Sequence, residues 1–86
     1  MEILYSPKFA RQYKKLSVVM QEKAEICESW FREDPFDPRL KTHKLSGVLE
    51  GFYAFSVNFS HRIIFDFESK NVVRFYQIGA HDIYDA

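Results

Sequence analysis

The stretch that decides the fold covers residues 62–78 and runs RIIFDFESKNVVRFYQI. Aromatic and β-branched residues fill both of its halves, 62–67 and 72–78, which predicts two strands. The polar residues 68–71 between them are typical of a hairpin turn. Because residues 63–65 are apolar on both faces, the first of these strands is expected at the centre of a sheet.

Outward from this hairpin, residues 52–59 predict a third strand whose side chains alternate between two faces. One face carries apolar side chains: Tyr53, Phe55, Val57 and Phe59. The other face carries small or polar ones: Ala54, Ser56 and Asn58. We therefore expect helices to cover the apolar face, and the nearly polar face to stay free to bind a partner.

The N-terminal half of the chain predicts one short strand, at residues 2–5, and two helices. A serine and a proline are typical of a helix start, and the apolar spacing after them predicts a helix over residues 7–16. Similar spacing predicts a second helix over residues 18–34, which two prolines end. Residues 34–51 contain no long periodic segment and are expected to form a loop.

The element order β-α-α-β-β-β predicts an α+β fold. An N-terminal helical hairpin packs on one face of a mostly antiparallel four-stranded sheet. The length of 86 residues and the lack of any linker or repeat predict a single domain over residues 1–86.

The composition excludes several classes of protein. A single cysteine, Cys27, excludes an internal disulfide framework, and its apolar neighbours at helical spacing predict an inert core thiol. Because no leader-like segment or long apolar run is present, we expect a cytoplasmic protein that does not enter a membrane. Twelve basic and twelve acidic residues leave no net charge, and basic residues gather at 8–15 and 39–44. A polyanion would thus meet two local patches rather than a global positive field.

Four segments carry a resemblance to a known family. They are LKTHKLSG at residues 40–47, GFY at 51–53, HRIIF at 61–65 and IGAHDIY at 78–84. In this order and at these separations they resemble the toxins of the RelE/ParE superfamily, most closely its YafQ- and YoeB-like mRNA interferases. The resemblance covers the whole chain and implies the RelE/ParE-like fold.

What the resemblance implies for function is the toxin of a type II toxin–antitoxin system, a ribosome-dependent mRNA endoribonuclease. In its metal-free cleavage the ribose 2′-hydroxyl attacks the adjacent phosphate and leaves a cyclic phosphate and a 5′-hydroxyl. Such a reaction needs a base, an acid and a cation, roles that suit histidine and arginine. No cofactor is implied, and the three histidines lack the close spacing that is usual for metal ligands.

Two histidines are the implied proton-transfer groups. His81 matches the family's C-terminal catalytic histidine, which implies a general acid or base. His43, in the basic loop, corresponds to a second active-site histidine, which implies the complementary proton transfer or a phosphate contact. Without the resemblance, His81 would be interpreted as a surface or capping residue, and His43 as a loop residue that anchors Leu45.

Two further residues complete the implied catalytic set. Arg62 corresponds to the arginine that the YoeB-like branch uses on phosphate, while pairing with Asp66 on the same strand face is the structural alternative. Tyr84 resembles the terminal aromatic residue that stacks on a base or orients the phosphate. A hydrophobic plug is the alternative for Tyr84.

Contacts with RNA are implied for Lys41, Lys44 and His61. The lysines would follow the RNA backbone, and His61 would be a third histidine of the site; solvated lysines and a strand-edge histidine are the alternatives. The chain also departs from the ribonuclease branches, which place basic or histidine side chains where it has Ala54 and Ser56. This departure favours weak or absent activity.

Three hypotheses for function therefore remain. The first is the mRNA interferase. The second is a ParE-like inhibitor of DNA gyrase, which the element order permits but which does not need the histidines. The third is a catalytically weak or inactive homologue that only binds its antitoxin. All three imply a cognate antitoxin and a toxin–antitoxin hetero-oligomer, and the first adds mRNA in the ribosomal A site as a partner.

Overall fold

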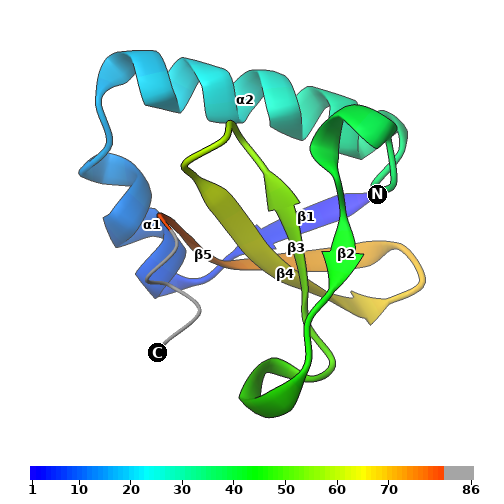
Figure 1. Ribbon diagram of the computed structural model, residues 1–86. Coiled ribbons are helices and arrows are strands. Elements are labelled where there is room, and N and C mark those ends of the chain that lie inside the picture. Colours follow the sequence, from blue (N-terminus) through cyan, green and yellow to red (C-terminus); the bar gives the residue numbers. More distant parts are fainter. Residues whose placement is uncertain (81–86) are drawn as a thin grey trace.

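The computed structural model describes residues 1–80, and these form one sheet with two helices on one face (Figure 1). His81 and Tyr84 lie outside the described residues. The helices are α1 (Pro7–Lys14) and α2 (Val18–Glu33), with short 3₁₀ turns at Pro38–Leu40 and Gly47–Leu49. The strands are β1 (Glu2–Tyr5), β2 (His43–Lys44), β3 (Tyr53–Ser56), β4 (Arg62–Ser69) and β5 (Val72–Gly79).

The sheet has the strand order β1-β5-β4-β3-β2. β1 runs parallel to β5, and every other neighbouring pair is antiparallel. The α+β fold and the central position of β4 are confirmed, but the sheet has five strands rather than the expected four. The extra strand, β2, is only two residues long, so it gives no sequence periodicity and forms through its pairing with β3.

Serine caps begin both helices at the expected places. The Oγ of Ser6 accepts a hydrogen bond from the backbone N–H of Phe9 at 2.9 Å, and the Oγ of Ser17 accepts one from Met20 at 3.1 Å. Because each cap satisfies an N–H group that would otherwise lack an intrahelical partner, the helices start where the serines stand. The two helices end within two residues of the predicted ends.

Four phenylalanines join α2 to the sheet. Phe31 of α2 packs on three strand residues, with ring centroids 5.1 Å from Phe55, 4.9 Å from Phe65 and 5.3 Å from Phe75. All four side chains are fully buried. Burial of one such ring stabilises the fold by about 2–3 kcal/mol, so this cluster holds the helical layer on the sheet.

Cys27 and Phe59 test the expected burial pattern in opposite ways. Cys27 is buried in α2 with its Sγ 3.5 Å from the carbonyl oxygen of Val57, and burial raises the pKa of its thiol, as an inert core cysteine requires. The expectation that helices cover Phe59 is wrong, because its side chain is 90% exposed. β3 ends at Ser56, and Phe59 lies in the turn after it, where strand alternation no longer applies.

The helix-free face of the sheet is less open than expected. Ala54 and Ile64 form a second, fully buried cluster there, and three side chains from the segment before β3 pack against them: Leu45, Leu49 and Phe52. The segment 45–52 therefore covers the middle of this face. The sequence pattern of β3 showed a small residue at position 54, but not the segment that folds over it.

Candidate active site

His43 lies on the helix-free face, at the edge of the sheet. It pairs with Ala54, which in turn pairs with Ile64, and paired residues of neighbouring strands share a face. The side chain of His43 is exposed, and its Nδ1 lies 3.0 Å from the carbonyl oxygen of Lys41. Because a carbonyl oxygen only accepts hydrogen bonds, Nδ1 carries the proton and Nε2 is left to accept a proton or contact a ligand.

The loop before His43 is held in a defined shape. Lys41 adopts the left-handed conformation with a φ of 53°, next to the fully buried Leu40. The hydroxyl of Thr42 donates a hydrogen bond of 2.6 Å to the carbonyl oxygen of Pro35. These contacts fix the path of the chain into β2. The position of His43 therefore depends on the conformation of this loop.

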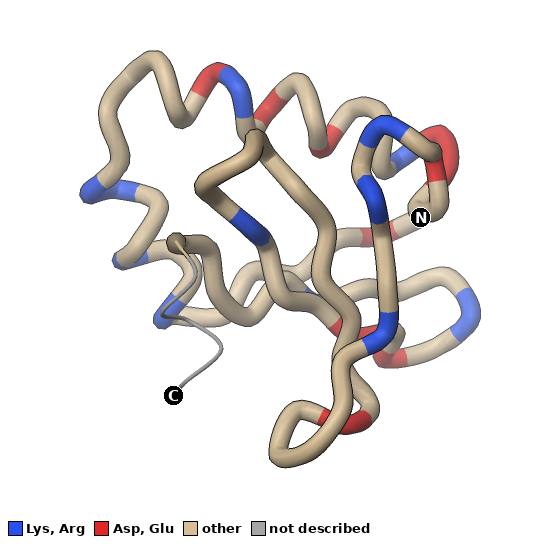
Figure 2. The backbone as a smooth tube through the Cα atoms, viewed as in Figure 1, with Lys and Arg blue, Asp and Glu red and all other residues tan. Residues whose placement is uncertain are grey.

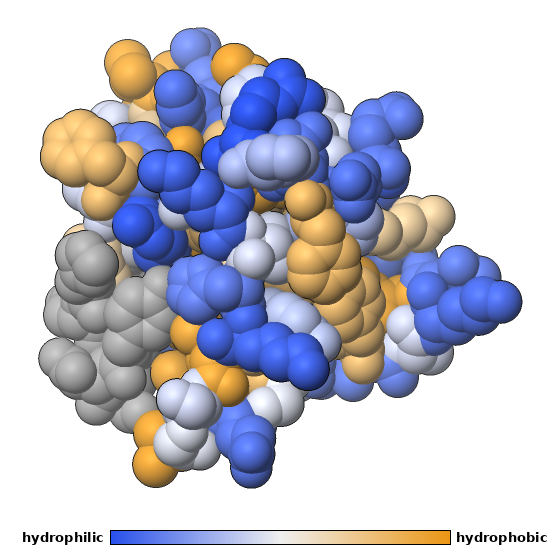
Figure 3. Space-filling model, turned by 45° about the vertical axis from the view of Figure 1, so that its right-hand side comes forward, coloured by the Kyte–Doolittle hydropathy of each residue, from blue (hydrophilic) through white to orange (hydrophobic). Residues whose placement is uncertain are grey.

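The basic residues of this loop have different surroundings. Arg39 is bound to Asp37 at 2.9 Å and lies over the ring of Trp30, 3.9 Å from its centroid. Lys41 and Lys44 are exposed, although Lys44 lines a hollow together with Glu50. Figure 2 marks the Lys and Arg positions along the backbone in blue. On the face seen in Figure 3, hydrophobic patches interrupt the hydrophilic surface. The loop therefore offers two lysines to a polyanion but no continuous cationic platform.

Arg62 is the first residue of β4 and lies on the same face as His43. It pairs with Ser56, two residues along β3 from the partner of His43. Its Nη1 donates hydrogen bonds to the carbonyl oxygens of Asn58 at 2.7 Å and His61 at 3.1 Å. Within residues 1–80 Arg62 forms no ion pair with Asp66, so the expected structural alternative is not seen there.

The separation of His43 and Arg62 follows from the sheet register. The two residues are two strands and two residues apart, which places their Cα atoms roughly 12 Å from each other. Gly79 pairs with Arg62 on the other side of β4, so the chain leaves the described part of the sheet beside this arginine.

Comparison with known proteins identifies the fold of this chain. No family model and no curated protein matches the sequence. Among solved structures, a YoeB/ParE toxin from Agrobacterium tumefaciens matches with a TM-score of 0.80 and 19% identity, over 94% of this chain and 99% of that chain. YafQ from E. coli strain BL21(DE3) matches with a TM-score of 0.77 and 18% identity, over 99% of this chain and 98% of that chain. The fold is that of the YoeB and YafQ toxins.

A third structure, the YoeB–YefM complex from Staphylococcus aureus, matches with a TM-score of 0.77 and 21% identity, over 94% of this chain and 97% of that chain. The expected resemblance to toxins of the RelE/ParE superfamily is thus confirmed for the fold. The comparisons therefore find the YoeB/YafQ-like fold through the structure, at sequence identities of 18–21%.

His61 lies in the turn between β3 and β4 of the YoeB/YafQ-like fold. Its backbone N–H donates a hydrogen bond of 2.8 Å to the Oδ1 of Asn58, and its Nδ1 lies 2.8 Å from the Oγ of Ser60. The side chain is half-buried. These contacts give His61 a local structural role, in contrast to the exposed ring of His43.

One polar cluster on the helix-free face of this YoeB/YafQ-like fold was missed by the sequence analysis. Asp66 pairs in register with Arg74, whose guanidinium forms an ion pair with Glu68 and donates a hydrogen bond of 3.3 Å to the hydroxyl of Tyr76. The Oδ1 of Asp66 is buried without a hydrogen-bond partner among the described residues, and burial followed by the charge of Glu68 raises the pKa of Asp66. Alternation along β4 puts Asp66 on the face of Ile64, but its pairing with Arg74 depends on the register of the β4–β5 hairpin, which the sequence pattern does not give.

Tyr76 lies at a bulge in β5. Ile64 pairs with Gln77 and Phe65 with Phe75, so Tyr76 is an extra residue in β5. Its ring packs on Phe52 with centroids 4.9 Å apart.

Among residues 1–80, no three histidine, cysteine or acidic side chains gather closely enough to hold a metal ion. No helix of these residues is long and apolar enough to cross a membrane.

Proposed function

We propose that the chain is the toxin of a type II toxin–antitoxin system and acts as a ribosome-dependent mRNA endoribonuclease. The observation that carries this proposal is that His43 and Arg62 share the helix-free face of a YoeB/YafQ-like fold. The two residues come from segments that resemble the family's active-site motifs.

Each group has a role in the proposed reaction. One histidine, His43 or His81, takes the proton of the ribose 2′-hydroxyl as its oxygen attacks the adjacent phosphate. The other histidine donates a proton to the 5′-oxygen as the bond between phosphorus and that oxygen breaks. The products are a cyclic phosphate and a 5′-hydroxyl, so no water, metal or cofactor is consumed.

Arg62 would stabilise the negative charge that develops on the phosphate. Its Nη1 is held by the carbonyl oxygens of Asn58 and His61, so the guanidinium is oriented before a ligand arrives. A planar fork of N–H groups suits two phosphate oxygens at once. Tyr84 is proposed to stack on a base or orient the phosphate.

Lys41 and Lys44 would bind the RNA backbone. Each phosphate contact of this kind makes the affinity depend on salt, with a slope of about −0.7 in log–log form for single strands. Two exposed lysines therefore predict a modest slope, consistent with a chain of no net charge. The ribosomal A site, rather than free RNA, is the proposed place of cleavage.

A cognate antitoxin is the proposed protein partner. YoeB from Staphylococcus aureus, similar to this chain in fold, was solved as a heterotetrameric toxin–antitoxin complex with YefM. By analogy, we expect the single domain over residues 1–86 to form a hetero-oligomer with its antitoxin in the cytoplasm.

A weak or inactive homologue that only binds its antitoxin is the second candidate. The burial of Ala54 with Ile64 under Leu45, Leu49 and Phe52 favours it, because Ala54 is one of the two positions, with Ser56, where the resemblance implies basic or histidine side chains. A purified chain that binds an antitoxin tightly but leaves both RNA and gyrase unaffected would establish this candidate.

The deciding experiment is a cleavage assay on programmed ribosomes with mapped 5′-hydroxyl ends. Loss of an acid or base lowers cleavage about 10²- to 10⁴-fold, so His43→Ala and His81→Ala should each show such a loss. Lys70→Ala, an exposed change in the turn between β4 and β5, is the matched control and should cleave like the wild type. Intact transcripts with the wild type, and identical behaviour of His81→Ala, would overturn the proposal. Cleaved DNA that accumulates in a gyrase supercoiling assay would support the gyrase hypothesis instead.

A further inference from the structure

The turn between β3 and β4 carries the most exposed aromatic side chain of residues 1–80. This residue, Phe59, is 90% exposed. No other ring among residues 1–80 packs on it. A phenylalanine left in water forgoes the favourable free energy that burial of its ring would contribute. Both faces of this ring are therefore open to a flat ligand.

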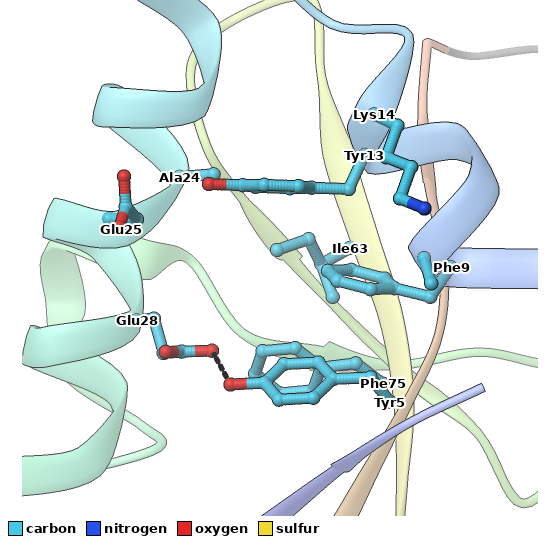
Figure 4. A pocket seen from close by; sticks show the side chains of 10 residues that line it. Tyr5, Phe9, Tyr13, Lys14, Ala24, Glu25, Glu28, Ile63 and Phe75 are labelled. Atoms are coloured by element: carbon cyan, nitrogen blue, oxygen red, sulfur yellow. Dashed lines mark hydrogen bonds between the residues drawn. The ribbon is translucent and has the colours of Figure 1, made fainter. Parts of the chain in front are cut away.

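The other exposed aromatic side chains of residues 1–80 already stack on a neighbour. Tyr5 stacks on Phe9 at 5.5 Å in the wall of a cavity of about 340 Å³ between α1, α2 and the sheet (Figure 4). Phe36 and Phe67 stack on each other at 6.3 Å. In each of these pairs one ring face is covered by the protein itself. Phe59 is therefore the exposed ring of this part of the chain that keeps both faces free.

Hydrogen bonds fix the turn that carries Phe59. The Oδ1 of Asn58 accepts hydrogen bonds from the backbone N–H of Ser60 at 2.9 Å, from its hydroxyl at 3.0 Å and from the backbone N–H of His61 at 2.8 Å. The Nδ2 of Asn58 lies 3.7 Å from the Sδ of Met20, and this contact anchors the turn to α2 (Figure 1). The backbone that presents the ring is thus held in place before a ligand arrives.

The same turn orients the arginine of the candidate active site. The carbonyl oxygen of Asn58, the residue before Phe59, accepts a hydrogen bond of 2.7 Å from the Nη1 of Arg62. In a planar trans peptide the carbonyl oxygen and the next Cα lie roughly 3 Å apart, so the Cα of Phe59 is within about 6 Å of this nitrogen. The other N–H groups of the guanidinium suit a phosphate. A free ring and a phosphate-binding group therefore stand on one turn.

This combination favours single-stranded RNA as the ligand. Proteins hold unpaired strands by stacking bases on aromatic side chains while cationic side chains contact the backbone. Paired bases cover one another within a duplex, so the ring requires an unpaired base. A protein partner would favour a more continuous apolar patch. The neighbours of Phe59 in the turn are instead polar: Asn58, Ser60 and His61.

We propose that Phe59 stacks on an unpaired base of the RNA substrate, next to the phosphate that Arg62 contacts. The proposal rests on the RNA-binding part of the proposed function and adds a contact that holds the substrate. Because every base has an aromatic face, this contact accepts any base, and it favours purines, whose larger ring system stacks more strongly. Its loss lowers the affinity for RNA and leaves the chemical step unchanged.

Binding to RNA that cannot be cleaved tests this contact apart from catalysis. Ribosomes carry a message whose A-site codon has 2′-deoxyribose, which lacks the attacking hydroxyl, and 2-aminopurine at each codon position in turn. Stacking quenches the fluorescence of this base, so the wild type should quench it at one position. Phe59→Leu keeps an apolar side chain without aromatic faces, and it should bind about tenfold more weakly and quench little. Phe59→Trp should bind and quench at least as strongly as the wild type.

An abasic site at the quenched position identifies stacking as the cause. Loss of that base should weaken the wild type about tenfold and leave Phe59→Leu unchanged, because both changes remove the same contact. Phe36→Leu is the matched control, since it makes the same replacement at an exposed ring that already stacks on Phe67. It should bind RNA like the wild type. No quenching by the wild type, or equal affinities of the wild type and Phe59→Leu, would refute the stacking contact and leave the ring to a protein partner.

Cleavage rates keep this proposal separate from that of the ribonuclease. On a cleavable message Phe59→Leu should raise KM about tenfold with an unchanged kcat, whereas His43→Ala should lower kcat. A wild type that quenches 2-aminopurine but cleaves no message would contradict the ribonuclease function and support the stacking contact. A wild type that cleaves, together with an unchanged KM in Phe59→Leu, would contradict the stacking contact alone.

Discussion

The two faces of the sheet use the same strands but are covered in different ways. On the helix side, Phe31 of α2 packs on rings from three strands, and all of these side chains are fully buried. On the other side, the cluster of Ala54 and Ile64 is covered by a segment without long helices or strands, and His43 lies exposed at its edge. The first face is thus covered by the large rings under a long helix, and the second by a few apolar side chains of the segment 45–52.

This difference separates the residues that hold the fold from those that carry the proposed chemistry. A large buried ring stabilises the fold through the apolar area that it buries and through close packing. Its removal therefore lowers the free energy of unfolding by several kcal/mol. An exposed histidine contributes almost nothing to packing and is therefore available for a reaction. Substitutions on the two faces should accordingly differ in their effects on the free energy of unfolding.

Phe31→Ala should have the largest effect. The ring contacts three other buried phenylalanines, and such a truncation costs about 3–5 kcal/mol of unfolding free energy. Urea unfolding followed by circular dichroism measures the loss. Phe59→Ala is the matched control, because Phe59 is 90% exposed and its removal should change the free energy by no more than about 0.5 kcal/mol. Similar losses in the two variants would contradict the burial pattern described for Phe59.

Ile64→Ala should have a smaller but clear effect. Ile64 is buried in the second cluster, and removal of its side chain costs about 2–3 kcal/mol if the segment 45–52 covers it. The same urea experiment applies, with Val48→Ala as control at a position that is 87% exposed. A loss below about 1 kcal/mol for Ile64→Ala would mean that this segment does not cover the helix-free face in solution.

The contrast between the faces also explains what the sequence could predict. The apolar alternation in β3 to β5 and the serine caps are local patterns, so four of the five strands, both helices and the helix-covered face were predicted. β2 was not predicted, because two residues carry no period and its existence depends on pairing with β3. Phe59 was misplaced because a turn dictated by Asn58 interrupts the alternation.

For the candidate site, the sequence identified residue types but not their common face. The placement of His43 beside Ala54 follows from β2, so no local pattern could have given it. The role of His61 in a turn depends on Asn58 and Ser60, and the grouping of Asp66 with Arg74 depends on the β4–β5 register. In all three cases the arrangement depends on contacts between segments that are apart in the chain or on strand register. The periodicity of one sequence gives no information about these contacts.

His43→Ala should change stability little while it strongly reduces the proposed activity. The side chain is exposed and makes one hydrogen bond, to the carbonyl oxygen of Lys41, so its loss should cost no more than about 0.5 kcal/mol. His61→Ala provides the comparison: it removes a half-buried ring from the turn and should cost about 1 kcal/mol. Unfolding free energies and cleavage rates are measured on the same samples. A large stability loss in His43→Ala would show that its role is structural.

The smallest effect is expected at Asp66 and depends on pH. Because burial raises the pKa of Asp66 in the folded state, ionisation of this carboxyl opposes folding. The stability that its neutral form provides is complete below the unfolded pKa, near 3.8, and is lost as the pH rises through the folded value. Asp66→Asn should therefore raise the unfolding free energy at pH 7, and the gain should vanish at acidic pH.

Asp37→Asn is the matched variant, and its expected effect on the free energy of unfolding at pH 7 has the opposite sign. Its carboxylate accepts hydrogen bonds from the side chain and backbone of Arg39, which lower the pKa of Asp37. That stabilisation is present above the unfolded pKa and is lost as the pH falls through the folded value. Asp37→Asn should therefore destabilise the protein at pH 7, and its effect should also disappear in acid. If Asp66→Asn instead destabilises the protein at pH 7, as Asp37→Asn should, the burial of Asp66 does not control the ionisation of its carboxyl.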